Sequence, residues 1–269
     1  MGKFDGVLLA SDYDDTLYGT DMTVSAENVK AIEYFTAQGG TFTVATGRAH
    51  RTFEAQAPKV PCNAPVILSG GAALYDFRTG RYVCETFLPH RVKEDLKELC
   101  SVFPSLGFEA YHGDDIYVHN PNAVTMRHIC RAQVDFVERP IDKMSEPWSK
   151  VILQQEHEIL LPAQSYMLEH WGEHYEVIFS NPVLLELTCK GSNKGGMVLR
   201  LAEMLGISRE HIYCVGDNQN DIPMLSVSAI PFAPSGCAPE VRAWGPRLVG
   251  SCDESCIAQI IGILDERYS

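Results

Sequence analysis

Residues 7–17 read VLLASDYDDTL, a short apolar run that ends in three carboxylates and a hydroxyl. An apolar run of this length, bounded by a turn signal, predicts a buried strand. Because open α/β sheets bind ligands at the carboxyl ends of their strands, we expect Asp12 at that end, with Asp14 and Asp15 in the following loop. Clustered carboxylates need a compensating cation or a raised pKa, and Mg²⁺ is the simplest compensator. The alternative is an ordinary acidic turn, since Asp is common in turns.

Outward from this stretch, strands and helices alternate. Residues 41–46 and 65–68 are predicted strands, and a helix that Ser25 caps lies before the first of them. After residue 184 the same alternation returns, with strands predicted at 211–215 and 229–233. Strand–helix–strand units at this spacing predict a parallel sheet with right-handed crossovers, and therefore an α/β fold.

Between these two halves the pattern changes. Residues 75–88 and 108–119 carry hairpin signals, and helical segments separate the strands that follow. Hairpins mixed with helices predict an α+β domain. We therefore predict a core formed by residues 1–82 and 186–269, with a domain of residues 83–185 inserted into it.

The composition narrows the class of protein. A length of 269 residues allows one or two domains, and a net charge of −13 argues against a nucleic-acid partner and against an anionic membrane. There is no apolar run of roughly 18 residues, which a membrane-spanning helix requires. The nine cysteines form no C-x-x-C pair, and no signal-peptide pattern stands at the start, so we expect a cytoplasmic protein. We expect it to be a monomer or a weak homodimer.

A second acidic loop follows another predicted strand. Asp217 and Asp221 come directly after residues 211–215, while Thr46 ends a strand and Lys194 begins a helix. Each of these alone has an ordinary explanation as a turn or a solvated side chain. Together they supply carboxylates for a hard cation, a hydroxyl, an ammonium and helix N-terminal amides, which suit phosphoryl transfer.

The spacing of these residues resembles the motifs of the haloacid dehalogenase superfamily. Residues 12–17 resemble its first motif, D-x-D-x-T-L, and 46–48 (TGR) its second. Lys194 resembles the third, and residues 216–225 (GDNQNDIPML) resemble the fourth. A long insertion between the second and third motifs is similar to the Cof-type (subfamily IIB) phosphatases. The resemblance implies a Rossmann-like parallel-sheet core with an inserted α+β cap domain that selects the substrate.

The resemblance also implies a role for each matching residue. Asp12 would be the nucleophile that forms an aspartyl-phosphate, and Asp14 the general acid and then the base. The metal would be Mg²⁺, held by the carboxylates of Asp12 and Asp217 and by the backbone carbonyl of Asp14, with Asp221 supporting it indirectly. The phosphate would be bound by Thr46, Gly47, Lys194 and Asn220.

One position departs from the family pattern. Where relatives often have Asn-Gly-Ala after the third strand, this chain has Gly70-Gly71-Ala72, so a substrate contact from that Asn is missing. In the cap, the polar candidates for substrate contact are Tyr111, His112, Asp114, Asp115 and Arg127.

The sequence therefore predicts a Mg²⁺-dependent phosphatase that hydrolyses a small phosphomonoester, with a sugar phosphate as the expected substrate. Two alternatives stay open at this point. A phosphomutase of the same fold would return the phosphoryl group to the substrate. A phospho-receiver or sugar-phosphate sensor would not turn over, although a receiver lacks so long an insertion.

Overall fold

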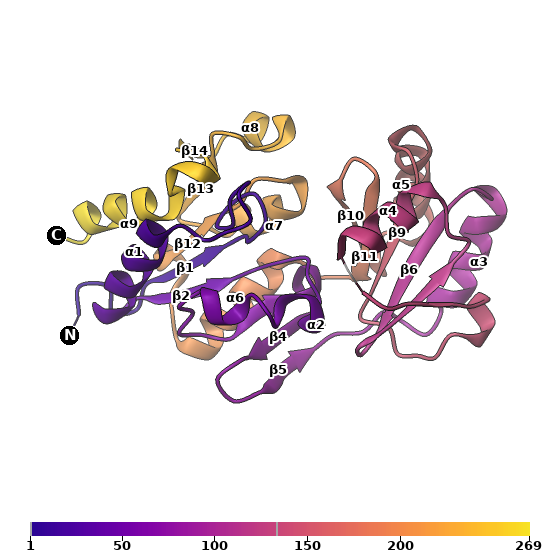
Figure 1. The fold of residues 1–269 in the computed structure, drawn as a ribbon, viewed down its shortest axis with the longest axis horizontal. Coiled ribbons are helices and arrows are strands. Elements are labelled where there is room, and N and C mark those ends of the chain that lie inside the picture. The colour runs from indigo at the N-terminus through magenta and orange to yellow at the C-terminus, as the bar shows by residue number, and fades with distance from the viewer. Residues whose placement is uncertain (1, 133) are drawn as a thin grey trace.

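The computed structural model describes residues 2–132 and 134–269. It has two lobes, a core that contains both chain ends and a cap formed by the middle of the chain (Figure 1). The core is α/β and the cap has its own antiparallel sheet, so the predicted fold class is confirmed.

The core is organised around a parallel sheet in which β1 (Leu8–Ser11) is an inner strand. The spatial order of its five strands is β14 (Arg247–Val249), β13 (Ile230–Pro234), β12 (Ile212–Val215), β1 and β2 (Thr41–Val44). On one side β1 pairs with β2, the next strand in the chain. On the other it pairs with β12, where each residue lies opposite one 204 positions later, from Leu8↔Ile212 to Ser11↔Val215. The strand order thus reverses at β1, which is where open α/β sheets place their ligand sites.

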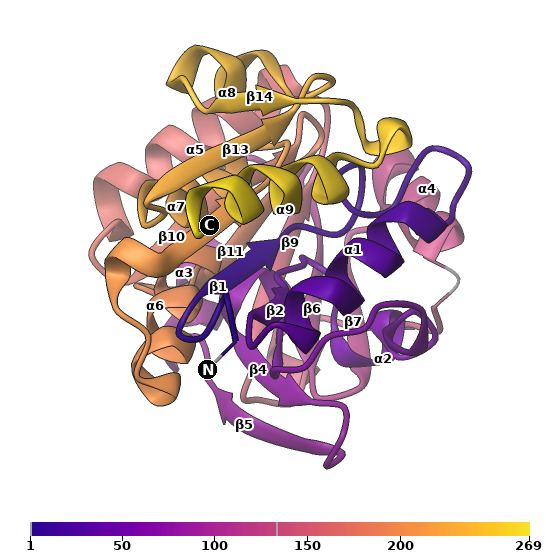
Figure 2. The same cartoon turned by 90° about the vertical axis from the view of Figure 1, so that its left-hand side faces the viewer.

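Helices cover both faces of this sheet. Helices α1 (Ala26–Ala37) and α9 (Cys256–Arg267) lie side by side on one face (Figure 2), where Ile32 and Ile260 pack against strand residues such as Leu9. On the other face α6 (Lys194–Leu205) and α7 (Ile222–Ser226) bury Val198 and Leu225. The remaining core helices are α2 (His50–Phe53) and α8 (Pro239–Trp244).

The third predicted strand, β3 (Val66–Leu68), lies beside β2 through a single parallel bridge between Ala45 and Ile67. It then turns into an antiparallel extension with β4 (Ala73–Asp76) and β5 (Arg81–Glu85). The predicted hairpin at residues 75–88 is this extension, and it belongs to the core.

The cap contains a six-stranded sheet. Its strands, in spatial order, are β10 (Tyr175–Asn181), β11 (Leu184–Cys189), β9 (Lys150–Gln154), β6 (Gly107–His112), β7 (Asp115–His119) and β8 (Val137–Glu138). Helices α3 (Val92–Val102) and α5 (His157–Trp171) bury their apolar sides against one face of the sheet. A smaller apolar cluster, which includes Ile129 of α4 (Ala123–Ala132), lies on the opposite face.

The sheet pairings move the predicted domain boundaries. The boundary at residue 83 falls inside β5, which pairs with β4 of the core, and the boundary at 186 falls inside β11, which pairs with β9 and β10 of the cap. Strands β8 and β14 and helix α8 had no sequence prediction, because each is short. Among the described residues, no helix combines the length and apolarity needed to cross a membrane.

Candidate active site

The predicted carboxylates converge at the carboxyl ends of β1 and β12. Ser11 pairs with Val215 at the last position of these strands, so Asp12 and Asp217 leave adjacent strand ends. One oxygen from each of Asp12, Asp217 and Asp221 lies within 4.8 Å of the others. Residues 200 positions apart in the chain therefore form one acidic cluster, as the parallel-sheet prediction requires.

Lys194, at the start of α6, is the cation of this cluster. Its ammonium donates to Asp12 Oδ1 at 2.5 Å and to Asp221 Oδ1 at 2.6 Å, and the side chain is only 1% exposed. The other oxygen of Asp221 accepts hydrogen bonds from the backbone N–H groups of Asp217 and Asn218, both at 3.0 Å. Asp221 is thus fully used in holding Lys194 and the loop after β12.

Burial and the neighbouring charges together shift the pKa values of Asp12, Asp217 and Lys194. Burial raises the pKa of Asp12, and the Lys194 ammonium opposes that rise. Burial and then the neighbouring Asp221 raise the pKa of Asp217 to about 7. Burial alone would lower the pKa of Lys194, but attraction to Asp12 and Asp221 outweighs burial and raises it, so this lysine stays charged.

The donor set fits a hard divalent cation. Mg²⁺ prefers oxygen ligands and often uses one or two carboxylates. Within residues 2–132 and 134–269, the Asp217 carboxylate accepts a single hydrogen bond, from Thr16 Oγ1 to Oδ1 at 3.1 Å, and the Asp12 carboxylate accepts one from Lys194, at Oδ1. Asp12 and Asp217 thus keep free oxygens for a metal, whereas Asp221 does not. The resemblance assigns the metal to the same two carboxylates, and this assignment stays a prediction.

Asp14 is held by an arginine to which the sequence analysis gave no role. The Arg48 guanidinium donates to both carboxylate oxygens of Asp14, at 2.6 and 2.9 Å, and lies 5.2 Å from the ring centre of Tyr13. The hydrogen bond to Asp14 is the largest cause of the raised pKa of Arg48. A paired fork of this kind fixes the orientation of a carboxylate.

We expect Arg48→Met to lower kcat by about tenfold, which is less than the full contribution of a general acid. The reason is that the variant keeps Asp14 but removes both hydrogen bonds that orient it. Steady-state kcat and KM on one phosphomonoester measure this, with Arg51→Met as the control on the neighbouring helix. A variant that changes KM alone would contradict a positioning role.

Thr46 and its neighbours form the loop beside the carboxylates. The Thr46 hydroxyl accepts a hydrogen bond from the Arg48 N–H at 3.1 Å, and its carbonyl accepts one from Gly70 N–H at 3.0 Å. The carbonyl of Gly47 accepts a hydrogen bond at 2.7 Å from Lys150, which belongs to the cap. The loop that is predicted to bind phosphate therefore contacts both lobes.

Two glycines allow the site to close tightly. Gly71 has φ +107, and a Cβ there would overlap the backbone of Asn193, directly before Lys194. A Cβ on Gly216 would overlap the side chain of Asp221. Both positions therefore need glycine, because Gly71 approaches the backbone before Lys194, and Gly216 the side chain of Asp221, too closely for any larger residue.

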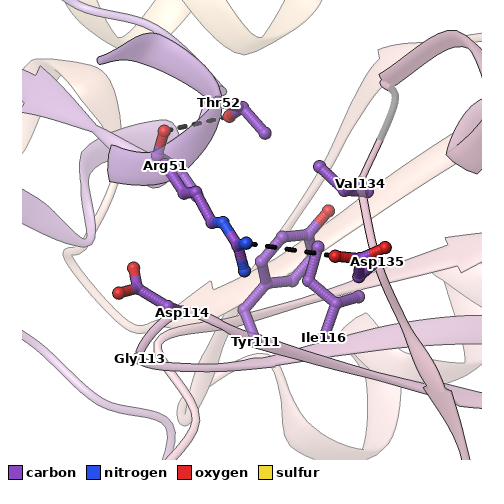
Figure 3. A pocket seen from close by; sticks show the side chains of 9 residues that line it. Arg51, Thr52, Tyr111, Gly113, Asp114, Ile116, Val134 and Asp135 are labelled. Atoms are coloured by element: carbon purple, nitrogen blue, oxygen red, sulfur yellow. Dashed lines mark hydrogen bonds and ion pairs between the residues drawn. The ribbon is translucent and has the colours of Figure 1, made fainter.

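The cap meets the core along α2 and the loop before it. His50 Nδ1 lies 3.8 Å from Asp114 Oδ1, and Arg51 lies 4.0 Å from Asp135. Figure 3 shows Arg51 reaching across a cavity of about 10 Å³ toward Asp135, with Tyr111 on the cap side. Lys150 lies 4.6 Å from the ring centre of Tyr111.

The predicted cap residues divide into two groups. Tyr111 and Asp114 line the cavity at the junction with the core. His112 instead contacts the carbonyl of Pro147 at 2.8 Å, Asp115 is exposed, and Arg127 pairs with Glu156 at 3.6 Å. Tyr111 also donates to the buried Glu109 at 2.7 Å, which fixes its orientation.

Most of the predicted site residues therefore come together, and one lacks a contact. Asn220 is half-buried beside the cluster, but its side chain makes no hydrogen bond within the described residues, and Asp221 orients Lys194 instead. Arg48 and Lys150 were missed. The TGR motif contained a signal for Arg48, whereas no local pattern marks Lys150.

Comparison with known proteins agrees with this geometry. A family model described as haloacid dehalogenase-like hydrolase matches residues 9–261. The 5-amino-6-(5-phospho-D-ribitylamino)uracil phosphatase YwtE of Bacillus subtilis is 24% identical, over 97% of this chain and 99% of that protein. The HMP-PP phosphatase of Serratia proteamaculans is also 24% identical, over 94% of this chain and 93% of that protein.

Solved structures show the same fold. The subclass IIB sugar phosphatase BT4131 superposes with a TM-score of 0.80 at 18% identity, covering 96% of this chain and 98% of that one. At this identity the likeness concerns the fold, including the inserted cap.

Proposed function

Because the chain belongs to the haloacid dehalogenase-like hydrolase family and its named relatives are phosphatases, we propose that it is a Mg²⁺-dependent phosphatase acting through an aspartyl-phosphate. We propose that its substrate is a small sugar phosphate. The match to the family model confirms the family resemblance that the sequence motifs predicted.

The observation that carries the proposal is the arrangement around Asp12. One oxygen of Asp12 would attack phosphorus while the other stays with the cations, and the buried Lys194 ammonium, 2.5 Å from Oδ1, holds the carboxylate in position for this. Asp14 lies two residues further along the chain, and it would exchange a proton with the oxygen of the leaving alcohol. Thr46 is buried nearby and, with Lys194, offers donors for phosphoryl oxygens.

The residues divide the reaction into two steps. In the first, an oxygen of Asp12 bonds to phosphorus, the bond to the leaving alcohol breaks, and Asp14 gives that alcohol a proton. In the second, Asp14 takes a proton from water as the water oxygen bonds to phosphorus and Asp12 is released. Lys194 and Thr46 hold the phosphoryl oxygens throughout. Asp12 and Asp217 would hold Mg²⁺, which would supply positive charge that stabilises the phosphoryl oxygens.

The test is phosphate release from a panel of sugar phosphates, nucleotides and an aryl phosphate, with Mg²⁺ and with a chelator. We expect release that requires Mg²⁺, with a sugar phosphate as the best substrate. Absence of steady-state release from every compound would contradict the phosphatase. A bisphosphate activator that restores turnover would then indicate a phosphomutase instead.

We expect Asp217→Asn to lose Mg²⁺ binding and to gain stability in the metal-free protein. Asp217 contributes a free carboxylate oxygen, and its raised pKa shows that the charge is unfavourable where it is buried. The amide keeps an acceptor for Thr16 while removing the charge. Thermal unfolding with and without Mg²⁺ measures both effects, because a ligand that binds the native state raises Tm.

Asp253→Asn, in an exposed loop outside the cluster, is the control for this experiment. It should show the same Mg²⁺-dependent rise in Tm as the unmodified protein. A rise of equal size in Asp217→Asn would mean that Asp217 does not bind the metal.

A further inference from the structure

Tyr111, Lys150 and Glu186 share the face of the cap sheet that meets the core. Tyr111 is paired with Lys150 across β6 and β9, and Glu186 of β11 is paired with Ile152, two residues along from Lys150. Since side chains alternate between the two faces of a strand, these three residues lie on one face. The hydrogen bond from Lys150 to Gly47 O shows that this face is turned toward the core.

The Glu186 carboxylate lies over two glycines of the phosphate-binding loops. A Cβ on Gly47 would be 3.3 Å from Glu186 Oε1, and a Cβ on Gly70 would be 3.0 Å from Oε2. Gly47 follows Thr46 in the chain, and the Gly70 N–H donates to the carbonyl of Thr46. The carboxylate is therefore at the rim of the site, on the cap side of Thr46.

This carboxylate has no partner in the described part of the chain. Glu186 is half-buried, and across residues 2–132 and 134–269 it makes neither a hydrogen bond nor an ion pair. Lys150 is only 2% exposed, yet over the same residues no carboxylate lies within 4.0 Å of its ammonium, which contacts Gly47 O and the Tyr111 ring. The Glu186 oxygens are not enclosed by the protein, so they are open to a ligand that supplies hydrogen-bond donors.

We propose that Glu186 determines specificity by accepting a hydrogen bond from a hydroxyl group of the leaving alcohol. This rests on the proposed phosphatase function and narrows its substrate to a phosphomonoester with a hydroxyl near the phosphate. Lys150 anchors the loop under Glu186 through Gly47 and so sets the distance between cap and phosphate. The absence of a side chain at Gly70, which departs from the family pattern, leaves the space that the carboxylate faces.

The experiment compares Glu186→Gln with the unmodified enzyme, both with Mg²⁺, on two substrates. One is the best sugar phosphate of the panel, and the other is p-nitrophenyl phosphate, which has no hydroxyl group. The amide of this variant has the same size as the Glu186 carboxylate. It is a weaker hydrogen-bond acceptor, because hydrogen bonds to charged groups are stronger than those to neutral groups. We expect kcat/KM to fall about tenfold or more on the sugar phosphate. On the aryl phosphate it should rise, because a negative charge near the phosphate dianion is removed.

Glu169→Gln, which makes the same change on the exposed side of α5, is the matched control and should change neither value. An equal fall on both substrates would show that Glu186 only positions the cap, and the proposal would be overturned. It would also be overturned if neither value changed. Failure of the unmodified enzyme to release phosphate from any compound is a separate result, because it contradicts the phosphatase function itself.

Discussion

Asp12→Asn is expected to abolish phosphate release, by at least about 10⁴-fold, while the fold stays intact. The amide lacks the anionic oxygen that attacks phosphorus. The fold should persist because Lys194 keeps its second partner, Asp221, at 2.6 Å. Removal of one buried negative charge from a cluster of three carboxylates also relieves repulsion among them.

Asp15→Asn is a matched control for this variant. Asp15 lies in the same loop but is exposed, and its φ of +60° is a conformation that Asn also adopts readily. We expect it to keep activity within about twofold, and both variants to keep their far-ultraviolet circular dichroism. Near-normal turnover by Asp12→Asn would show that another residue is the nucleophile.

Lys194→Met is expected to have the largest effect on stability, at about 3–5 kcal/mol in the metal-free protein. The variant leaves Asp12 and Asp221 buried and without their cation. The raised pKa of Lys194 means that its stabilising effect is complete below the ordinary lysine pKa and is lost only as pH rises through the higher folded-state value. The unmodified protein therefore has the full contribution at neutral pH.

The loss in Lys194→Met should shrink as pH falls from 8 to 5, because protonation removes the unpaired buried charges. Denaturant unfolding at several pH values measures this, and a loss that is constant with pH would contradict it. Lys190→Met, an exposed lysine four residues earlier, is the control and should change stability little. Phosphate release should be lost in Lys194→Met with Mg²⁺ present as well, since no other ammonium contacts Asp12 within the described residues.

The core and the acidic cluster of Asp12, Asp217 and Asp221 could be predicted from the sequence because both depend on local patterns. An apolar run identifies a strand, and the polar residues after it lie at the edge where parallel strands end, as Asp12 and Asp217 do. The same reasoning placed the helix that starts at Lys194.

What it did not predict depends on contacts between distant parts of the chain. The alternating pattern of residues 184–189 identifies a strand but not its sheet, so β11 was divided between the two domains. The pairing of Arg48 with Asp14 spans 34 residues, and the contact of Lys150 with Gly47 spans 103. Propensity and periodicity do not report such contacts, which depend on how the two lobes meet.

The tight contact between Gly71 and the start of α6 has a mechanical consequence. Strand β11 of the cap ends at Cys189, and only four residues separate it from the helix that carries Lys194, so a movement of the cap would reach that helix unless its first turn were held. The Gly71 backbone packs closely against the Asn193 backbone, and this contact fixes the first turn of the helix to the core. Residues 190–192 are tied to the cap, since the Gly191 N–H donates to Glu176 Oε1 at 2.9 Å and the Thr188 hydroxyl donates to the Ser192 carbonyl at 2.6 Å. The first turn of α6, and with it the ammonium that contacts Asp12, is therefore held by the core and does not depend on the position of the cap.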